Sequence, residues 1–265
     1  MVGAVLRELD RAGLSENTIV MFLSDHGMAF PGIKANCYPD STRSPWIIRW
    51  PGKVVPGSDD RQHMLSSVDL QPTFLEALGL PPLKNCDGRS FLPVLLGERQ
   101  ANRDHVFTQF FHIHGRETFP MRAVLSREHA YIFNPWSNGQ RMFSRHWNGF
   151  AAYRELAGSS PAMKRRIKHL LHRSVEEFYA LDRDPHCLAN LLEGITPPEA
   201  SSDTIPRFRA LLRDYMQRFN DPALPAFDQR EDPKALEAFM RTYTARATRE
   251  KEELRSYEQE KGYRF

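Results

Sequence analysis

The sequence predicts an α/β fold in which part of a parallel sheet, with its helices, precedes a small antiparallel subdomain. The apolar run at 18–23 is rich in β-branched and aromatic residues, which is typical of a strand buried on both faces. Apolar residues at helical spacing over 2–9 predict an amphipathic helix before that strand. After residue 104 the pattern changes to short strands joined by tight turns.

The first predicted domain covers residues 1–104 and is the C-terminal part of a larger α/β domain. Its predicted elements are an opening helix ended by Gly13, strands at 18–23 and 45–50, a helix from Asp69 to Gly79 and a short helix ending at Gly97. A parallel sheet needs more strands than these. We therefore expect the chain to be the C-terminal part of a longer protein.

The second predicted domain, residues 105–222, is a small antiparallel sheet with a packing helix. Its predicted elements are strands at 105–111, 121–127, 129–134 and 177–181, a partly helical insertion at 139–176 and an amphipathic helix at 205–219. The remaining residues, 223–265, are expected to form a proline-rich extended segment and then a charged helix at 234–257.

The composition excludes several classes of protein. A net charge of +3 is too small to indicate nucleic-acid binding. Three cysteines without a CxxC pair predict neither a disulfide framework nor a zinc knuckle. No apolar run reaches the length of about 18 residues that a membrane span requires. The N-terminus lacks the basic and apolar regions of a signal peptide.

Asp25 and His26 follow the strand at 18–23 directly. Open α/β sheets bind ligands at the carboxyl ends of their strands, so this acid and imidazole are candidate site residues. Gly27 permits a sharp turn, and a loop long enough to fold back over the strand end carries Lys34. The plainer alternatives are a strand-end turn capped by Asp25 and a solvated surface lysine.

Four sequence blocks resemble one known family. They are N-T-I-V-M-F-L-S-D-H-G at 17–27, R-S-P-W-I-I-R-W-P-G at 43–52, P-M-R-A-V at 120–124 and F-Y-A-L-D-R-D-P-H-C-L-A-N-L at 178–191. Together they resemble the second half of a sulfatase, in particular the heparan N-sulfatase (sulfamidase) type. The resemblance implies an alkaline-phosphatase-like fold. It also implies hydrolysis of a sulfate ester or N-sulfate, on a glycosaminoglycan-type sugar.

The resemblance also implies roles for single residues. Asp25 and His26 would complete a calcium site; because imidazole is a poor calcium ligand, His26 would alternatively hydrogen-bond or protonate the substrate. Lys34 would neutralise the sulfuryl oxygens as a catalytic and substrate-binding residue. His112 and Arg122 would contact the sugar, the alternative being a satisfied strand histidine and a structural arginine. The spacing of His112 and His114 is also zinc-like, but no third ligand is evident.

The nucleophile of the family is not found in this sequence. Sulfatases use formylglycine, made from the Cys or Ser of C/S-x-P-x-R. Residues 37–41 imitate this motif but carry Ser41 where arginine is required, so we interpret Cys37 as a plain thiol. The paired aspartate ligands of the family are also missing. We expect the formylglycine in a missing N-terminal part, and this chain to be inactive alone.

Three alternatives stay open. A metal-dependent phosphohydrolase of the same superfamily would use a different nucleophile. A truncated or split-gene product would have no catalytic activity. The basic stretch at 164–173 could bind a glycan or nucleic acid, although a solvated helix face is the favoured interpretation. The sequence does not determine the compartment; the family is typically lysosomal, periplasmic or secreted.

Overall fold

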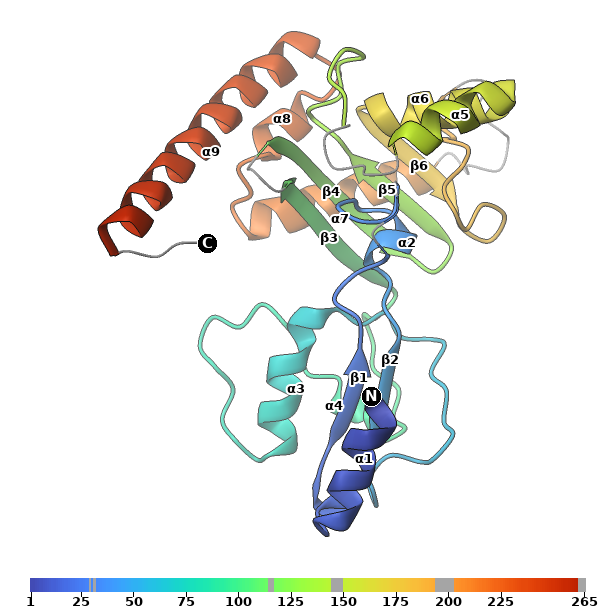
Figure 1. Cartoon of the computed structure of the whole chain (residues 1–265), viewed down its shortest axis with the longest axis vertical. Coiled ribbons are helices and arrows are strands. Elements are labelled where there is room, and N and C mark those ends of the chain that lie inside the picture. The colour runs from blue at the N-terminus through green and yellow to red at the C-terminus, as the bar shows by residue number, and fades with distance from the viewer. Residues whose placement is uncertain (29, 31, 114–116, 144–149, 194–202, 262–265) are drawn as a thin grey trace. The chain divides into compact units, whose positions relative to one another are not determined.

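The chain forms two compact units, shown in the computed structural model of Figure 1. The structure describes every residue except 29, 31, 114–116, 144–149, 194–202 and 262–265. The first unit comprises Met1–His26 and Arg43–Val106, and the second comprises Gly27–Thr42 and Phe107–Phe265. The sequence-based division had placed residues 27–42 in the first domain, whereas they fold with the C-terminal part of the chain.

The first unit contains a two-stranded sheet and short helices. Its elements are α1 (Val2–Arg11), η1 (Ser15–Asn17), β1 (Val20–Leu23), β2 (Trp46–Arg49), η2 (Ser67–Asp69), α3 (Leu70–Ala77) and α4 (Leu92–Leu95). The predicted helices and strands of this region are confirmed. α1 ends just before Gly13, whose φ of 67° lies in the left-handed region that glycine adopts without strain.

β1 differs from its prediction in its pairing. It pairs with β2 in antiparallel register, Val20 opposite Arg49 and Leu23 opposite Trp46, so the predicted parallel pairing is wrong. The prediction of burial on both faces is also wrong, because Phe22 is 46% exposed. Among the described residues β2 is the strand hydrogen-bonded to β1, and a two-stranded ribbon leaves much side-chain surface exposed.

The predicted antiparallel sheet lies in the second unit, apart from the first two residues of β3. Its strands lie in the order β3 (His105–His112), β4 (Thr118–Ser126), β5 (His129–Phe133) and β6 (Glu176–Ala180). The pairs β4–β5 and β5–β6 are antiparallel, which confirms the prediction. The predicted insertion between β5 and β6 contains two helices, α5 (Phe150–Ser159) and α6 (Pro161–His172).

Helix α7 (Thr204–Arg218) packs on this sheet and builds the core (Figure 1). Phe208, Leu212 and Met216 are buried on one side of the helix, at the spacing that places them on one face. They join Val124 of β4 and Phe178 of β6 in one hydrophobic cluster. The predicted packing of the amphipathic helix on the small sheet is thereby confirmed.

The segment after α7 is helical where an extended chain was predicted. α8 (Leu224–Asp228) begins with a proline in its first turn, where no backbone donor is required. Phe227 enters the hydrophobic cluster, so burial outweighs the proline content of the segment. The last helix, α9 (Pro233–Lys261), is confirmed, and its second half is mostly charged. No helix within the described ranges is both long and apolar enough to cross a membrane.

One short helix, α2 (Pro39–Thr42), ends the segment 27–42. This segment leaves the first unit after β1, enters the second, and returns to β2. It carries Lys34, and its course decides where that side chain lies.

Candidate functional site

Asp25 and His26 lie where β1 ends, in the first unit. Ser44 ties this strand end in place, since its hydroxyl accepts from the Ser24 amide at 3.0 Å and donates to the Ser24 carbonyl at 2.6 Å. The His26 amide donates to Asp25 Oδ1 at 3.0 Å, and His26 Nε2 lies 3.4 Å from Asp25 Oδ2. The Asp25 side chain is 83% exposed. A carboxylate and an imidazole therefore face solvent side by side.

This pair meets part of what calcium requires. Calcium binds six to eight oxygen atoms, and the exposed carboxylate of Asp25 offers two. The described residues contain no cluster of three or more metal-ligating side chains. Asp25 thus fits as one ligand of a larger set, and the calcium site stays a prediction.

Lys34 lies in the second unit, on the loop formed by residues 27–42. Its side chain is exposed, and its amide donates to the Phe30 carbonyl at 3.2 Å. Because Asp25 and His26 belong to the other unit, the meeting of these three side chains around one ligand stays a prediction.

The two predicted sugar contacts have different environments. His112 is exposed at the end of β3, where a ligand could reach it. His114, which completed the zinc-like spacing, lies outside the described residues.

Arg122 is buried, only 1% exposed, and it makes a two-point ion pair with Asp221 that includes a 3.0 Å contact from Nη2 to Oδ1. It also donates to the carbonyls of Phe110 and Met121. A buried guanidinium needs such partners, and Arg122 has them within the protein. This geometry favours the structural alternative for Arg122, and its role as a sugar contact stays a prediction.

Cys37 is a plain buried thiol, as interpreted. It is fully buried and unbridged, and burial raises its pKa to about 11. A thiol that remains protonated at neutral pH is a poor nucleophile. Residues 37–41 therefore resemble the formylglycine motif in sequence only, because the Cys37 thiol is unsuited to act as a nucleophile.

We expect Cys37 to resist thiol reagents. At pH 8 a thiol with a pKa of about 11 is about 0.1% ionised, and its burial further limits access. Mass-spectrometric labelling of the native protein should modify Cys86, which is partly exposed, at least about 100-fold faster than Cys37. Equal rates in the folded protein would contradict this, and equal rates after denaturation provide the control.

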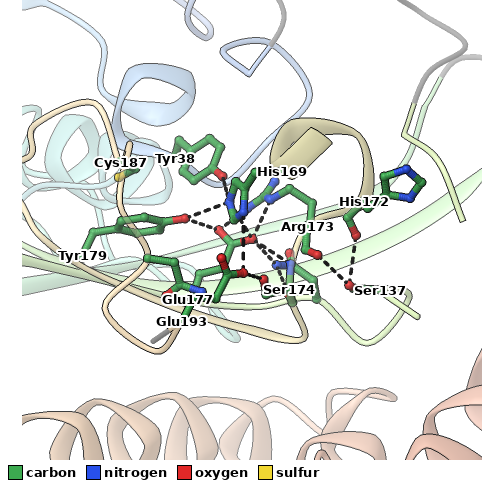
Figure 2. Close-up of polar contacts among 12 residues, drawn as sticks. Tyr38, Ser137, His169, His172, Arg173, Ser174, Glu177, Tyr179, Cys187 and Glu193 are labelled. Atoms are coloured by element: carbon green, nitrogen blue, oxygen red, sulfur yellow. Dashed lines mark hydrogen bonds and ion pairs between the residues drawn. The ribbon is translucent and has the colours of Figure 1, made fainter. Parts of the chain in front are cut away.

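A buried polar network lies next to the Lys34 loop, and the sequence did not predict it (Figure 2). Glu177 of β6 and Arg173, both 0% exposed, form a two-point ion pair of 2.7 and 2.8 Å. Tyr179 donates to Glu177 at 2.9 Å. His169 Nε2 lies 3.2 Å from the hydroxyl of Tyr38 and 3.1 Å from that of Tyr179.

The charges of this network stabilise each other. Burial alone would raise the pKa of the Glu177 carboxyl, but the charge of Arg173 holds that pKa well below its usual range. Burial alone would likewise lower the pKa of Arg173, and the charge of Glu177 raises it. The pair is therefore ionised although no water reaches it.

The basic stretch at 164–173 contributes to this network. The solvated-face interpretation describes Lys164, Arg165 and Lys168, which are exposed. It is wrong for Arg166, His169 and Arg173, which recur at spacings of three and four and turn inward with the buried Ile167 and Leu170. Arg166, for example, donates to the Cys187 carbonyl at 2.5 Å. That spacing is the sequence signal that could have distinguished the basic residues facing the protein from those facing solvent.

The fold of the chain is that of known hydrolases. A solved 2-O GAG sulfatase matches it with a TM-score of 0.59 at 24% identity, over 89% of this chain and 43% of that one. The phosphonate monoester hydrolase of Silicibacter pomeroyi matches with a TM-score of 0.55 at 18% identity, over 82% and 38%. These likenesses establish the alkaline-phosphatase-like fold.

The sequence comparisons point to one family with this fold. Residues 1–80 match the sulfatase family model, and the N-sulphoglucosamine sulphohydrolase of Homo sapiens is 29% identical over 82% of this chain. The first 80 residues of the chain are thus similar to the sulfatase family. It spans 44% of the length of that human relative.

Proposed function

We propose that this chain forms part of a sulfatase that hydrolyses a sulfate ester or an N-sulfate on a sulfated sugar. The observation that carries the proposal is the match of residues 1–80 to the sulfatase family, because Asp25, His26 and Lys34 all lie within that stretch. The names of the relatives support the substrate class. One acts on N-sulphoglucosamine, and another was solved with D-glucosamine-2-N,6-O-disulfate as its substrate.

Each of the three residues suits one task. Lys34 presents a compact cation that would neutralise the sulfuryl oxygens as negative charge develops on the leaving group. His26, beside the Asp25 carboxylate, would give a proton to the leaving oxygen or nitrogen. Asp25 would hold calcium with its exposed oxygens. Calcium, when bound, supplies positive charge next to the sulfate group.

The proposed enzyme needs a nucleophile that this sequence does not contain. We propose that a polypeptide with the C/S-x-P-x-R motif completes the site. Sulfate release from an N-sulfated and an O-sulfated glucosamine should be measured in calcium, with the chain alone and with that polypeptide. We expect release with the combined components and none from the chain alone.

The other outcomes of this assay distinguish the alternatives. Faster hydrolysis of a phosphonate monoester than of either sulfate would indicate a phosphohydrolase, which the likeness to the phosphonate hydrolase makes worth testing. No hydrolysis by the combined components would indicate a non-catalytic protein.

We expect Lys34→Ala to weaken binding of N-sulfoglucosamine. A hydrogen bond to a charged group is worth about 1.5–3 kcal/mol, which corresponds to about a 10- to 100-fold loss of affinity. Calorimetric titration in calcium buffer measures it. Lys234→Ala, an exposed lysine of the same unit, is the matched control and should bind as the wild type does. Equal affinities of the two variants would show that Lys34 does not contribute to binding.

A further inference from the structure

The loop of residues 27–42 exposes Lys34 but buries the residues that follow it. Asn36 is 5% exposed, and Tyr38 is 2% exposed. Between Lys34 and Asn36, Ala35 has a φ of 61°, in the left-handed region that non-glycine residues adopt only where their surroundings enforce it. The backbone beside Lys34 is therefore held in an unfavourable conformation by contacts elsewhere.

The two ends of this loop are joined. The Gly27 amide donates to the Ser41 carbonyl at 2.8 Å. The Ser41 hydroxyl donates to the Asn36 carbonyl at 2.8 Å and accepts from the Asn36 amide at 3.2 Å. The loop is thus a closed unit, and its position depends on what Asn36 and Tyr38 contact.

Both residues contact Arg173, just after α6. Its Nη1 donates to Asn36 Oδ1 at 2.7 Å, and its guanidinium lies 4.2 Å from the centre of the Tyr38 ring. Such stacking of a cation on an aromatic face is favourable, more so where water is excluded. The Tyr38 hydroxyl also contacts His169 at 3.2 Å, as Figure 2 shows.

Arg173 itself has little freedom to move. Glu177 holds it at two points, and Glu177 also accepts from Asn134 Nδ2 at 3.0 Å. The backbone of Arg173 has a φ of 54°, a second position in the left-handed region. A guanidinium fixed in this way presents an Nη1 donor to Asn36 and its flat face to Tyr38 in one geometry.

We propose that Asn36, Tyr38 and Arg173 are positioning residues for Lys34. They hold the loop backbone in place, so the flexible lysine stem starts from a fixed point and less conformational freedom is lost when its ammonium meets an anion. The inference rests on the proposed function, since it takes the contact of Lys34 with a sulfated sugar from there.

The first test measures the loop without any ligand. We expect Asn36→Leu, which removes the acceptor of Arg173, to speed hydrogen exchange of the Lys34 amide at least about 10-fold. Asn36→Asp keeps an acceptor oxygen and should restore slow exchange. The matched control is Asn190→Leu, a buried asparagine that bonds the Phe178 and Leu192 amides and should leave Lys34 exchange unchanged.

The second test measures binding of N-sulfoglucosamine in a double-mutant cycle with Lys34→Ala. A positioning role acts through Lys34, so Asn36→Leu should lower affinity about 10-fold in the wild type and have no effect when Lys34 is absent. Tyr38→Phe, which removes one hydroxyl only, replaces Asn36→Leu in both tests if the latter does not fold.

The outcomes separate the inference from the function on which it rests. If Lys34→Ala binds N-sulfoglucosamine as tightly as the wild type does, the proposed function fails. The exchange rates alone then show whether Asn36 and Arg173 hold the loop backbone in place. The inference is overturned if the Lys34 amide of the tested variant exchanges at the wild-type rate. It is also overturned if the variant loses the same affinity with Lys34 present as with Lys34 replaced by alanine.

Discussion

We expect Glu177→Gln to lower the free energy of unfolding by about 3–5 kcal/mol at neutral pH, because it leaves the buried charge of Arg173 without a counter-charge. Gln is close to Glu in shape, so the loss reports the charge and not a cavity. Urea denaturation followed by circular dichroism measures it. Glu237→Gln, in the half-exposed pair with Arg141, is the matched control and should cost no more than about 0.5 kcal/mol.

The effect of Glu177→Gln depends on pH in a defined direction. The pKa of the Glu177 carboxyl is held well below its ordinary value of 4.5, mainly by Arg173, against the opposing effect of burial. A group with a lowered pKa in the folded state contributes its full stability above its unfolded pKa and loses it as the pH falls toward the folded one. The stability difference between the two proteins should therefore be constant above about pH 5.5 and shrink below pH 4.5. A difference that grows on acidification would contradict the ion-pair account.

We expect Gly27→Ala to disrupt the Lys34 loop. A Cβ on Gly27 would lie 2.0 Å from the Asp40 carbonyl oxygen and 2.6 Å from Cγ2 of Ile33. The Asp40 carbonyl is part of the backbone and cannot rotate away, so the hydrogen bond between Gly27 and Ser41 has to break. We expect a loss of about 2–4 kcal/mol in stability, the upper range for a single substitution, together with fast exchange of the Gly27 and Lys34 amides.

Gly158→Ala is the matched control for this substitution. Gly158 lies in α5 of the same unit, and a Cβ there would meet nothing within 4 Å. Alanine is the better helix former, so this variant should gain about 0.5–1 kcal/mol. Wild-type stability and exchange in Gly27→Ala would show that the loop does not depend on the close approach of its ends.

Local patterns predicted most of the elements. The short apolar runs and tight turns of residues 105–134 predicted β3, β4 and β5. The apolar spacing of Phe208 and Leu212 predicted that α7 would pack on the sheet. The failures occurred where tertiary packing overrides composition, as in α8, where burial of Phe227 favoured a helix over an extended chain.

The candidate site was predictable only in its chemical identities. Asp25, His26 and Lys34 could be named as candidates because the spacing of a motif is read directly from the sequence. The ion pair of Arg122 was not predictable, because its partner Asp221 lies far along the sequence and no local pattern links them. The same holds for Asn36 and Arg173, which are separated by 137 positions and meet through a 2.7 Å hydrogen bond.

The amino-acid order alone indicated the likeness to sulfatases, the types of most helices and strands, and which acid, imidazole and amine to examine. Only the tertiary structure decided that residues 27–42 fold with the C-terminal unit and that Asn36 in that segment bonds Arg173, the ion-pair partner of Glu177. The reason is physical: propensity and periodicity act between near neighbours in the chain, whereas burying an ion pair requires partners that only folding brings together.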